Sequence, residues 1–82
     1  MALTVGQCRA GRALLDWTMS DLSEAAGVSA MTVSRFESGE TVRTSSVDAL
    51  KTTLSAAGIT FIAANETSSI GGEGVRLTSK PE

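Results

Sequence analysis

The stretch from Leu22 to Glu40, "LSEAAGVSAMTVSRFESGE", decides the fold of this chain. Gly27 can adopt the left-handed backbone conformation that ends a helix, and Ser29 is a typical N-cap that begins the next one. Gly39 closes this next helix, which we place at residues 30–38. The stretch therefore predicts two short helices that meet across roughly three residues.

The residues before this pair predict a first helix from about Val5 to Asp16. Thr4 is followed three residues later by Gln7, a capping box in which both side chains satisfy free backbone groups at the helix start. Helical spacing places four residues on one inward stripe: Val5, Cys8, Arg12 and Leu15. Arg12 is the charged member, so its guanidinium either extends to solvent or meets a buried acid.

Thr18 and Asp21 repeat the capping pattern, so a second helix starts near Met19 and ends at Gly27. Two short helices that cross at a steep angle need a small residue where they meet, and Ser23 is suitable. Apolar residues would fill the contact: Leu22, Ala26, Val28, Val33 and Phe36. The outer face of the third helix then carries small side chains and little charge. Such a helix can enter a DNA major groove, which is about 12 Å wide.

A fourth helix is predicted from Ser45 or Ser46 to Gly58. Asp48 would lie in its first turn, where a negative charge is favourable. Its apolar stripe consists of Val47, Leu50 and Leu54. Gly58 ends the helix and begins a segment of different character.

Two short strands are predicted after the helices, in "ITFIAA" (59–64) and "GVRLTS" (74–79). An isolated two-stranded hairpin is marginally stable and has exposed edges, so a strand of a second chain is a suitable partner. The residues expected at this dimer contact are Ile59, Phe61, Ile62, Val75 and Leu77. The chain would divide into a helical domain (1–58), a β tail that joins the subunits (59–78) and a disordered terminus (79–82).

The composition is that of a small soluble globular domain, with 82 residues, 41% of them hydrophobic and 20% charged. No apolar run approaches the ~20 residues of a membrane helix, and the N-terminus lacks the apolar block of a signal peptide, so we expect a cytoplasmic protein. Cys8 is the only cysteine and there is no histidine, which argues against a disulfide, a zinc site and an imidazole-based catalytic pair. We expect no enzyme, metal or cofactor, and no small-molecule ligand is evident.

The net charge of −2 lacks the basic excess that is typical of nucleic-acid-binding proteins. Most acidic residues lie outside the stretch 25–44, which holds Arg35 and Arg43 against Glu37 and Glu40. The charge therefore argues only weakly against DNA binding.

The stretch 22–40 resembles the helix-turn-helix of the Xre/Cro and lambda-type phage repressor family, whose members are bacterial and phage transcription regulators. The resemblance covers about residues 4–58 and rests on a combination of residues: Leu22, Gly27, Val28, Ser29, Val33, Phe36, Glu37 and Gly39. The tail, "ITFIAAN" with "GEGVRL", is similar to compact members that end in two strands. The resemblance implies a mainly α fold: a lambda repressor-like helix-turn-helix bundle of four to five short helices plus a C-terminal β element.

The resemblance also implies roles for individual residues. Family members pair an arginine of the first helix with a glutamate near the end of the recognition helix, here Arg12 and Glu37. The base-contacting positions are Ala30, Met31, Ser34 and Arg35. The positions near the DNA backbone are Thr18, Ser29, Thr32, Ser38 and Arg43. Ala30 and Met31 can touch a thymine methyl but cannot identify adenine, so Arg35 is expected to make most direct base contacts, to guanine O6 and N7.

Two functions follow from these observations. The first is a dimeric regulator that binds double-stranded DNA sequence-specifically, most simply a repressor on palindromic operators, its own promoter included. The second is a protein-interaction module on the same fold, such as an antiactivator or an antitoxin. The net acidity and the apolar tip formed by Ala30 and Met31 suggest this alternative.

Overall fold

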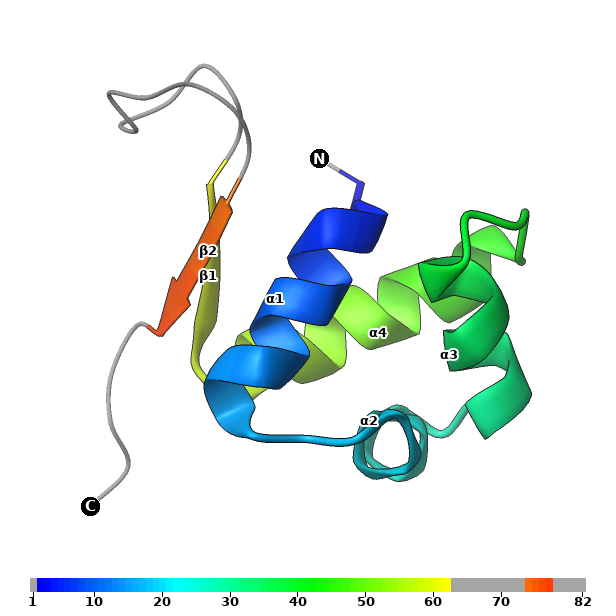
Figure 1. Cartoon of the computed structure of the whole chain (residues 1–82), viewed down its shortest axis with the longest axis horizontal. Helices are drawn as coiled ribbons and strands as arrows, with labels where there is room; N and C mark the ends of the chain where they lie inside the picture. Colours follow the sequence, from blue (N-terminus) through cyan, green and yellow to red (C-terminus); the bar gives the residue numbers. More distant parts are fainter. Residues whose placement is uncertain (1, 63–73, 78–82) are drawn as a thin grey trace.

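The computed structural model describes residues 2–62 and 74–77 and contains four helices followed by a two-stranded sheet (Figure 1). Along the chain these are α1 (Val5–Leu15), α2 (Met19–Ala26), α3 (Ala30–Glu37), α4 (Thr44–Ala56), β1 (Ile59–Ile62) and β2 (Gly74–Leu77). The predicted class, a mainly α helix-turn-helix bundle with a C-terminal β element, is confirmed.

Side-chain caps set where the first three helices begin. The hydroxyl of Thr4 accepts from the backbone N–H of Gln7 at 3.1 Å, and the Gln7 side chain accepts from the Thr4 N–H at 3.1 Å. Thr18 and Asp21 form the same reciprocal box at the start of α2. The Ser29 hydroxyl accepts from the N–H of the residue three positions on, at 3.0 Å. All three predicted helix starts are confirmed.

Left-handed residues determine where these helices end. Gly27 and Gly39 have positive φ angles of 73° and 89°, as the sequence predicts for residues that close a helix. Asp16 also adopts this conformation, with φ 59°, so α1 ends at Leu15 and the predicted last residue is its cap. Helix α3 likewise ends one residue before the prediction, with Ser38 as its cap.

The start of α4 differs from the prediction. The helix begins at Thr44, with Arg43 at the N-cap, and no side chain caps it. Because the helix starts earlier than Ser45, Asp48 lies beyond the first turn, and the predicted interaction of Asp48 with the positive helix end is wrong. The end is close to the prediction, since the last helical residue is Ala56.

The core lies between the four helices and the start of the hairpin. It consists of Leu3, Cys8, Leu22, Val33, Phe36, Leu50, Leu54 and Ile59. Helix α1 approaches α4 closely at Gly11, where an added Cβ would lie 3.4 Å from Leu54 Cδ2. Glycine at this position therefore permits the two helices to pack in direct contact.

Strands β1 and β2 pair antiparallel within one chain, with Ile59 opposite Leu77 and Phe61 opposite Val75. Ile59 is only 2% exposed and belongs to the protomer core, so its side chain is not available to a second chain as the dimer prediction requires. Phe61 is partly exposed. The predicted strand residues 63–64 and 78–79 and the predicted disordered terminus (79–82) lie outside the described residues.

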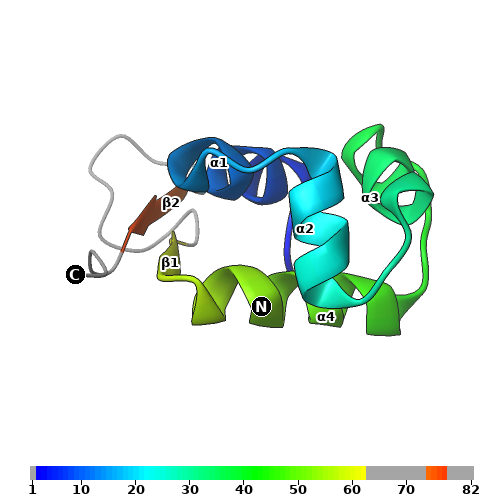
Figure 2. The same ribbon diagram turned by 90° about the horizontal axis from the view of Figure 1, so that it is seen from below.

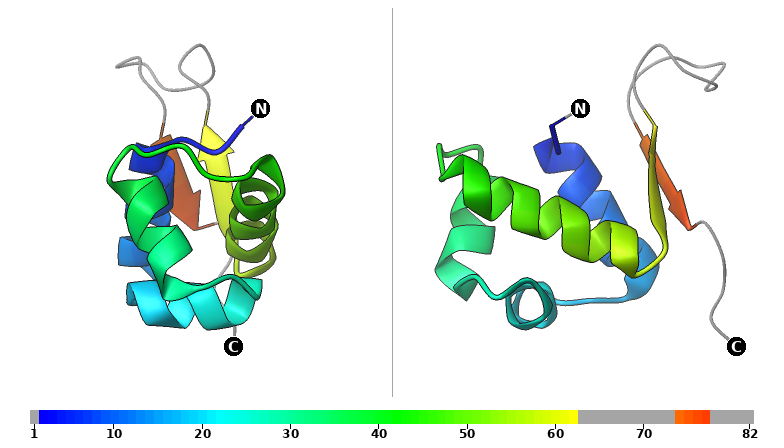
Figure 3. Two further views of the ribbon diagram at one scale, coloured as in Figure 1. Left: turned by 90° about the vertical axis from the view of Figure 1, so that its right-hand side faces the viewer. Right: turned by 180° about the vertical axis from the view of Figure 1, so that it is seen from behind.

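The hairpin and α3 occupy opposite ends of the molecule (Figures 1 and 2). The hairpin lies beside α1, whereas α3 stands between α2 and the connection that leads to α4 (Figure 3, left). None of the described helices combines the length and apolar character needed to cross a membrane.

Candidate nucleic-acid interface

Helix α3 has one buried face and one exposed face. Val33 is fully buried and Phe36 is 8% exposed, and both pack in the core with Leu22 of α2. The short turn at Gly27, together with the buried Ser23 of α2, lets the two helices pack at this contact. The inner face of α3 is therefore anchored, and its orientation is set by the core.

The outer face of α3 carries the four residues predicted to contact bases, and all four are exposed: Ala30, Met31, Ser34 and Arg35. Met31 is 62% exposed, the larger value of the two exposed large hydrophobic residues among those described. Burial of this side chain against another surface would contribute free energy to binding, although a single exposed apolar residue is common on protein surfaces and does not by itself indicate a partner.

An ion pair between Arg12 and Glu37 connects α1 to the C-terminal end of α3. Arg12 Nε lies 2.8 Å from Glu37 Oε2, and Nη2 lies 2.8 Å from Oε1, which is a bidentate arrangement. A third guanidinium nitrogen, Nη1, donates to the backbone carbonyl of Trp17 at 3.0 Å. The Glu37 side chain is 3% exposed and that of Arg12 is 18% exposed. Of the two sequence-based alternatives for Arg12, the structure shows the buried acid.

Cys8 adds a third donor to the Glu37 carboxylate. Its Sγ donates to Glu37 Oε2 at 3.3 Å, and the thiol is fully buried. Burial, the hydrogen bond to Glu37 and the charge of Glu37 raise the pKa of Cys8 to about 12, so the thiol stays protonated. The sequence predicts only a small core residue at this position. The two residues are 29 positions apart in the sequence, and no sequence pattern indicates their contact.

Burial alone would raise the pKa of Glu37, but the hydrogen bonds from Arg12 and Cys8, together with the charges of Arg12 and Arg9, outweigh it. The pKa of Glu37 therefore lies below its ordinary value of 4.5, and the carboxylate is ionised near neutral pH. Since its charge is paired inside the protein, Glu37 contributes little to the field at the outer face of α3. The exposed charges of stretch 25–44 are then Arg35 and Arg43 against Glu40, a small positive excess.

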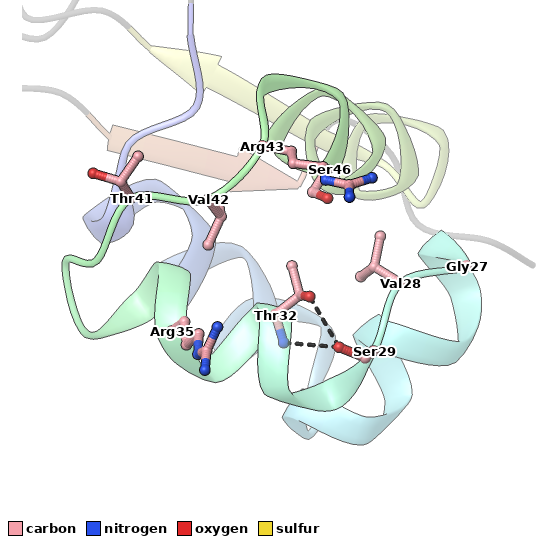
Figure 4. A pocket seen from close by; sticks show the side chains of 9 residues that line it. All are labelled: Gly27, Val28, Ser29, Thr32, Arg35, Thr41, Val42, Arg43 and Ser46. Carbon is pink, nitrogen blue, oxygen red and sulfur yellow. Dashed lines mark hydrogen bonds between the residues drawn. The ribbon is translucent and has the colours of Figure 1, made fainter.

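A groove of about 730 Å³ lies between α3 and the connection to α4 (Figure 4). It is lined by Gly27, Val28, Ser29, Thr32, Arg35, Thr41, Val42, Arg43 and Ser46. The Ser29 and Thr32 hydroxyl oxygens lie 2.9 Å apart on its α3 side. Arg43 and Ser46 lie on the opposite side (Figure 4). The groove thus combines hydroxyl groups with two arginines, which are suitable donors to phosphate oxygens.

The groove collects only part of the predicted backbone-contacting set. Ser29, Thr32 and Arg43 line it, whereas Thr18 and Ser38 lie elsewhere. Thr18 caps α2 through its hydroxyl, and Ser38 Oγ donates to the Ser34 carbonyl at 2.9 Å, so both hydroxyl groups already have a bond within the chain.

Two further groove residues with hydroxyl groups, Thr41 and Ser46, are not in the predicted set. They flank Arg43 in the sequence, in a polar segment that begins a helix, and only this position relative to Arg43 could have indicated them. Among residues 2–62 and 74–77, no group of three or more His, Cys, Asp or Glu side chains could hold a metal ion.

Comparison with known protein families gives a match that agrees with this helical architecture. A family model described as helix-turn-helix, HTH_3, matches residues 9–60, more than half of the chain. The chain belongs to the Xre and lambda repressor-like helix-turn-helix family. A search of curated proteins and a search of solved structures gave no match. This family consists of DNA-binding transcription regulators, and in its motif the second helix, here α3, is the one that enters the major groove.

Proposed function

We propose that the chain is a sequence-specific transcription regulator that binds DNA through the outer face of α3. The observation that carries this proposal is the geometry of α3, whose inner face is buried while its four outer residues stay exposed. The Arg12–Glu37 pair holds the C-terminal end of the helix to the body of the protein. Such a rigid, projecting helix suits a major groove.

Base contacts are assigned by side-chain chemistry. Arg35 is the one residue of the outer face that can bond a base edge bidentately, and its target is guanine through O6 and N7. Ala30 and Met31 pack against thymine methyl groups, and Ser34 donates to or accepts from either kind of base pair. With one strong polar contact per protomer, sequence-dependent DNA shape supplies the remaining discrimination.

Backbone contacts are assigned to the groove of about 730 Å³ beside α3. Ser29, Thr32 and Arg43 line the groove as the sequence predicts, and Thr41 and Ser46 extend the set. Arg43 is exposed at the N-cap of α4, from which it contacts a phosphate or the minor groove edge. Thr18 and Ser38 contact phosphates only through their remaining hydrogen-bonding capacity.

The regulator acts as a homodimer on a palindromic operator, with the recognition helices one DNA turn apart, roughly 34 Å. Binding beside a promoter blocks transcription, which makes repression, including repression of its own gene, the simplest outcome. Phe61, Ile62, Val75 and Leu77 of the hairpin remain the candidates for the dimer contact, since Ile59 is in the protomer core.

Selection of bound fragments from random and genomic DNA tests the function. We expect enrichment of an inverted repeat, with affinity that falls as salt rises, at a log–log slope of about −0.9 for each phosphate neutralised. A pull-down from the same cells is run in parallel. If one protein partner is captured and no DNA sequence is enriched, the regulator hypothesis is wrong and the protein-interaction module is the better account of the function.

The dimer is tested by truncation after Ile62, which retains Ile59 in the core and removes β2. We expect the full chain to be a dimer and the truncated chain a monomer by light scattering, with the helical circular dichroism retained. A Leu14→Ser variant, altered at an exposed apolar position of α1 (44% exposed), serves as the control and should stay dimeric. A truncated chain that remains a dimer would contradict a dimer contact through β2, with Val75 and Leu77, because β1 is still present.

A further inference from the structure

The C-terminal end of α3 positions Glu40 against Arg35 through its backbone. The N–H of Gly39 donates to the Phe36 carbonyl at 3.0 Å, and the N–H of Glu40 donates to the Arg35 carbonyl at 3.0 Å. With Gly39 in the left-handed conformation (φ 89°), these two bonds form a Schellman motif. The motif reverses the chain, so Glu40 is held over the last turn of α3 by backbone bonds.

In a Schellman motif the residues at the positions of Arg35 and Glu40 commonly make a hydrophobic contact with each other. Here they are occupied by opposite charges instead. Arg35 Nε lies 3.9 Å from Glu40 Oε1, and the two side chains are 58% and 61% exposed. Because Arg35 lies on the outer face of α3, the pair is accessible at the face through which DNA binding is proposed.

The nitrogen of the Arg35 guanidinium that faces Glu40 is Nε, and this determines which N–H groups remain to bind DNA. A guanidinium has five N–H donors in a fixed planar fork. When a carboxylate takes the Nε side, the two Nη groups remain for a bidentate bond to guanine O6 and N7. An arginine with this support has fewer rotamers available than an isolated one, and less conformational entropy is lost when it binds.

We propose that Glu40 is a positioning residue that orients Arg35 for guanine and so determines base specificity. The inference rests on the proposed DNA-binding function and deepens it. The same carboxylate repels the phosphates of every DNA sequence, so it lowers affinity in general while raising the preference for guanine. Removal of its charge therefore has two separable effects: tighter binding to all DNA, and weaker discrimination at one base.

The experiment uses the full chain with a selected duplex, the same duplex with the Arg35 guanine replaced by adenine or by 7-deazaguanine, and an unrelated duplex. Glu40→Gln should tighten the unrelated duplex and lower the preference for guanine by about two- to fivefold, the range of an exposed ion pair. Preferences at other base positions should not change. Glu24→Gln removes the same charge from an exposed position of α2 and should leave every preference unchanged.

The Arg35→Ala background supplies the decisive comparison. If Glu40 acts through Arg35, Glu40→Gln no longer alters guanine preference in that background, although it still tightens binding generally. If Glu40→Gln tightens the guanine and adenine duplexes by the same factor, Glu40 only repels phosphates and the inference is wrong, while DNA binding stands. If the wild-type chain binds none of the duplexes, the proposed function itself fails and the inference with it.

Discussion

Arg12→Ala is expected to lower the free energy of unfolding by about 3–5 kcal/mol, because it leaves the Glu37 carboxylate charged and buried without its partner. The Glu37 side chain is 3% exposed and takes two of its donors from Arg12. The effect is measured by thermal and urea unfolding of the two proteins. For a domain of this size, such a loss is a large part of the total stability.

Arg9→Ala is the matched control, since Arg9 lies on the same helix and is exposed. Equal thermal midpoints for Arg9→Ala and Arg12→Ala would show that the pair does not stabilise the fold. A double variant, Arg12→Met with Glu37→Leu, removes both charges and should recover much of the loss, because apolar residues of similar volume can replace a buried pair.

Acid supplies a second measure of the same pair. The pKa of Glu37 is lowered in the folded state, so its contribution to stability is present above its ordinary pKa of 4.5 and is lost as pH falls through the lower folded value. The stability difference between wild type and Arg12→Ala should therefore shrink below pH 4.5. A difference that stays constant through this range would point to lost packing of the arginine instead.

Arg35→Ala is expected to weaken binding to the selected operator about 5- to 150-fold for each half-site, the equivalent of about 1–3 kcal/mol for a bidentate base contact. Binding to unrelated DNA should change much less. Stability should stay near that of wild type, since the Arg35 side chain is 58% exposed. The measurement is a titration of both duplexes at one fixed salt concentration.

Arg43→Ala is the control for the loss of a positive charge. As a backbone contact, Arg43 should contribute equally to operator and unrelated DNA, so its removal should weaken both and make the salt slope shallower. Unchanged operator affinity in Arg35→Ala would remove the assigned base contact. Equal losses in the two variants, on both kinds of DNA, would make Arg35 another phosphate contact.

The starts of α1, α2 and α3 are predictable from the sequence because each depends on side chains close to it in the chain. Thr4, Thr18 and Ser29 satisfy backbone groups within three residues of their own position, so each cap is visible as a short pattern. Gly27 likewise acts on its own helix end. The sequence does not predict the left-handed conformation of Asp16, because this conformation is uncommon for a non-glycine residue and has no strong sequence signal.

Features that form between segments distant in the sequence are harder to predict from the sequence. The contact of Cys8 with Glu37 and the groove that includes Thr41 and Ser46 depend on how whole helices pack. The start of α4 was misplaced because no side chain caps it, and a serine further along offered a better pattern. The position of Arg12 on the inward stripe leaves two alternatives open, extension to solvent or a buried acid, and the resemblance indicates Glu37 as the acid.

The distance between α3 and the hairpin has a consequence for operator architecture. The molecule measures 35 Å along its longest axis, and these two elements lie at opposite ends (Figures 1 and 2). If two chains join through their hairpins, the angle between the two protomers sets the distance between their α3 helices. Two protomers inclined toward each other would place their α3 helices one DNA turn apart, roughly 34 Å. Two protomers arranged end to end would place them two turns apart, roughly 68 Å. The half-site spacing of the selected DNA therefore measures the angle between the two protomers.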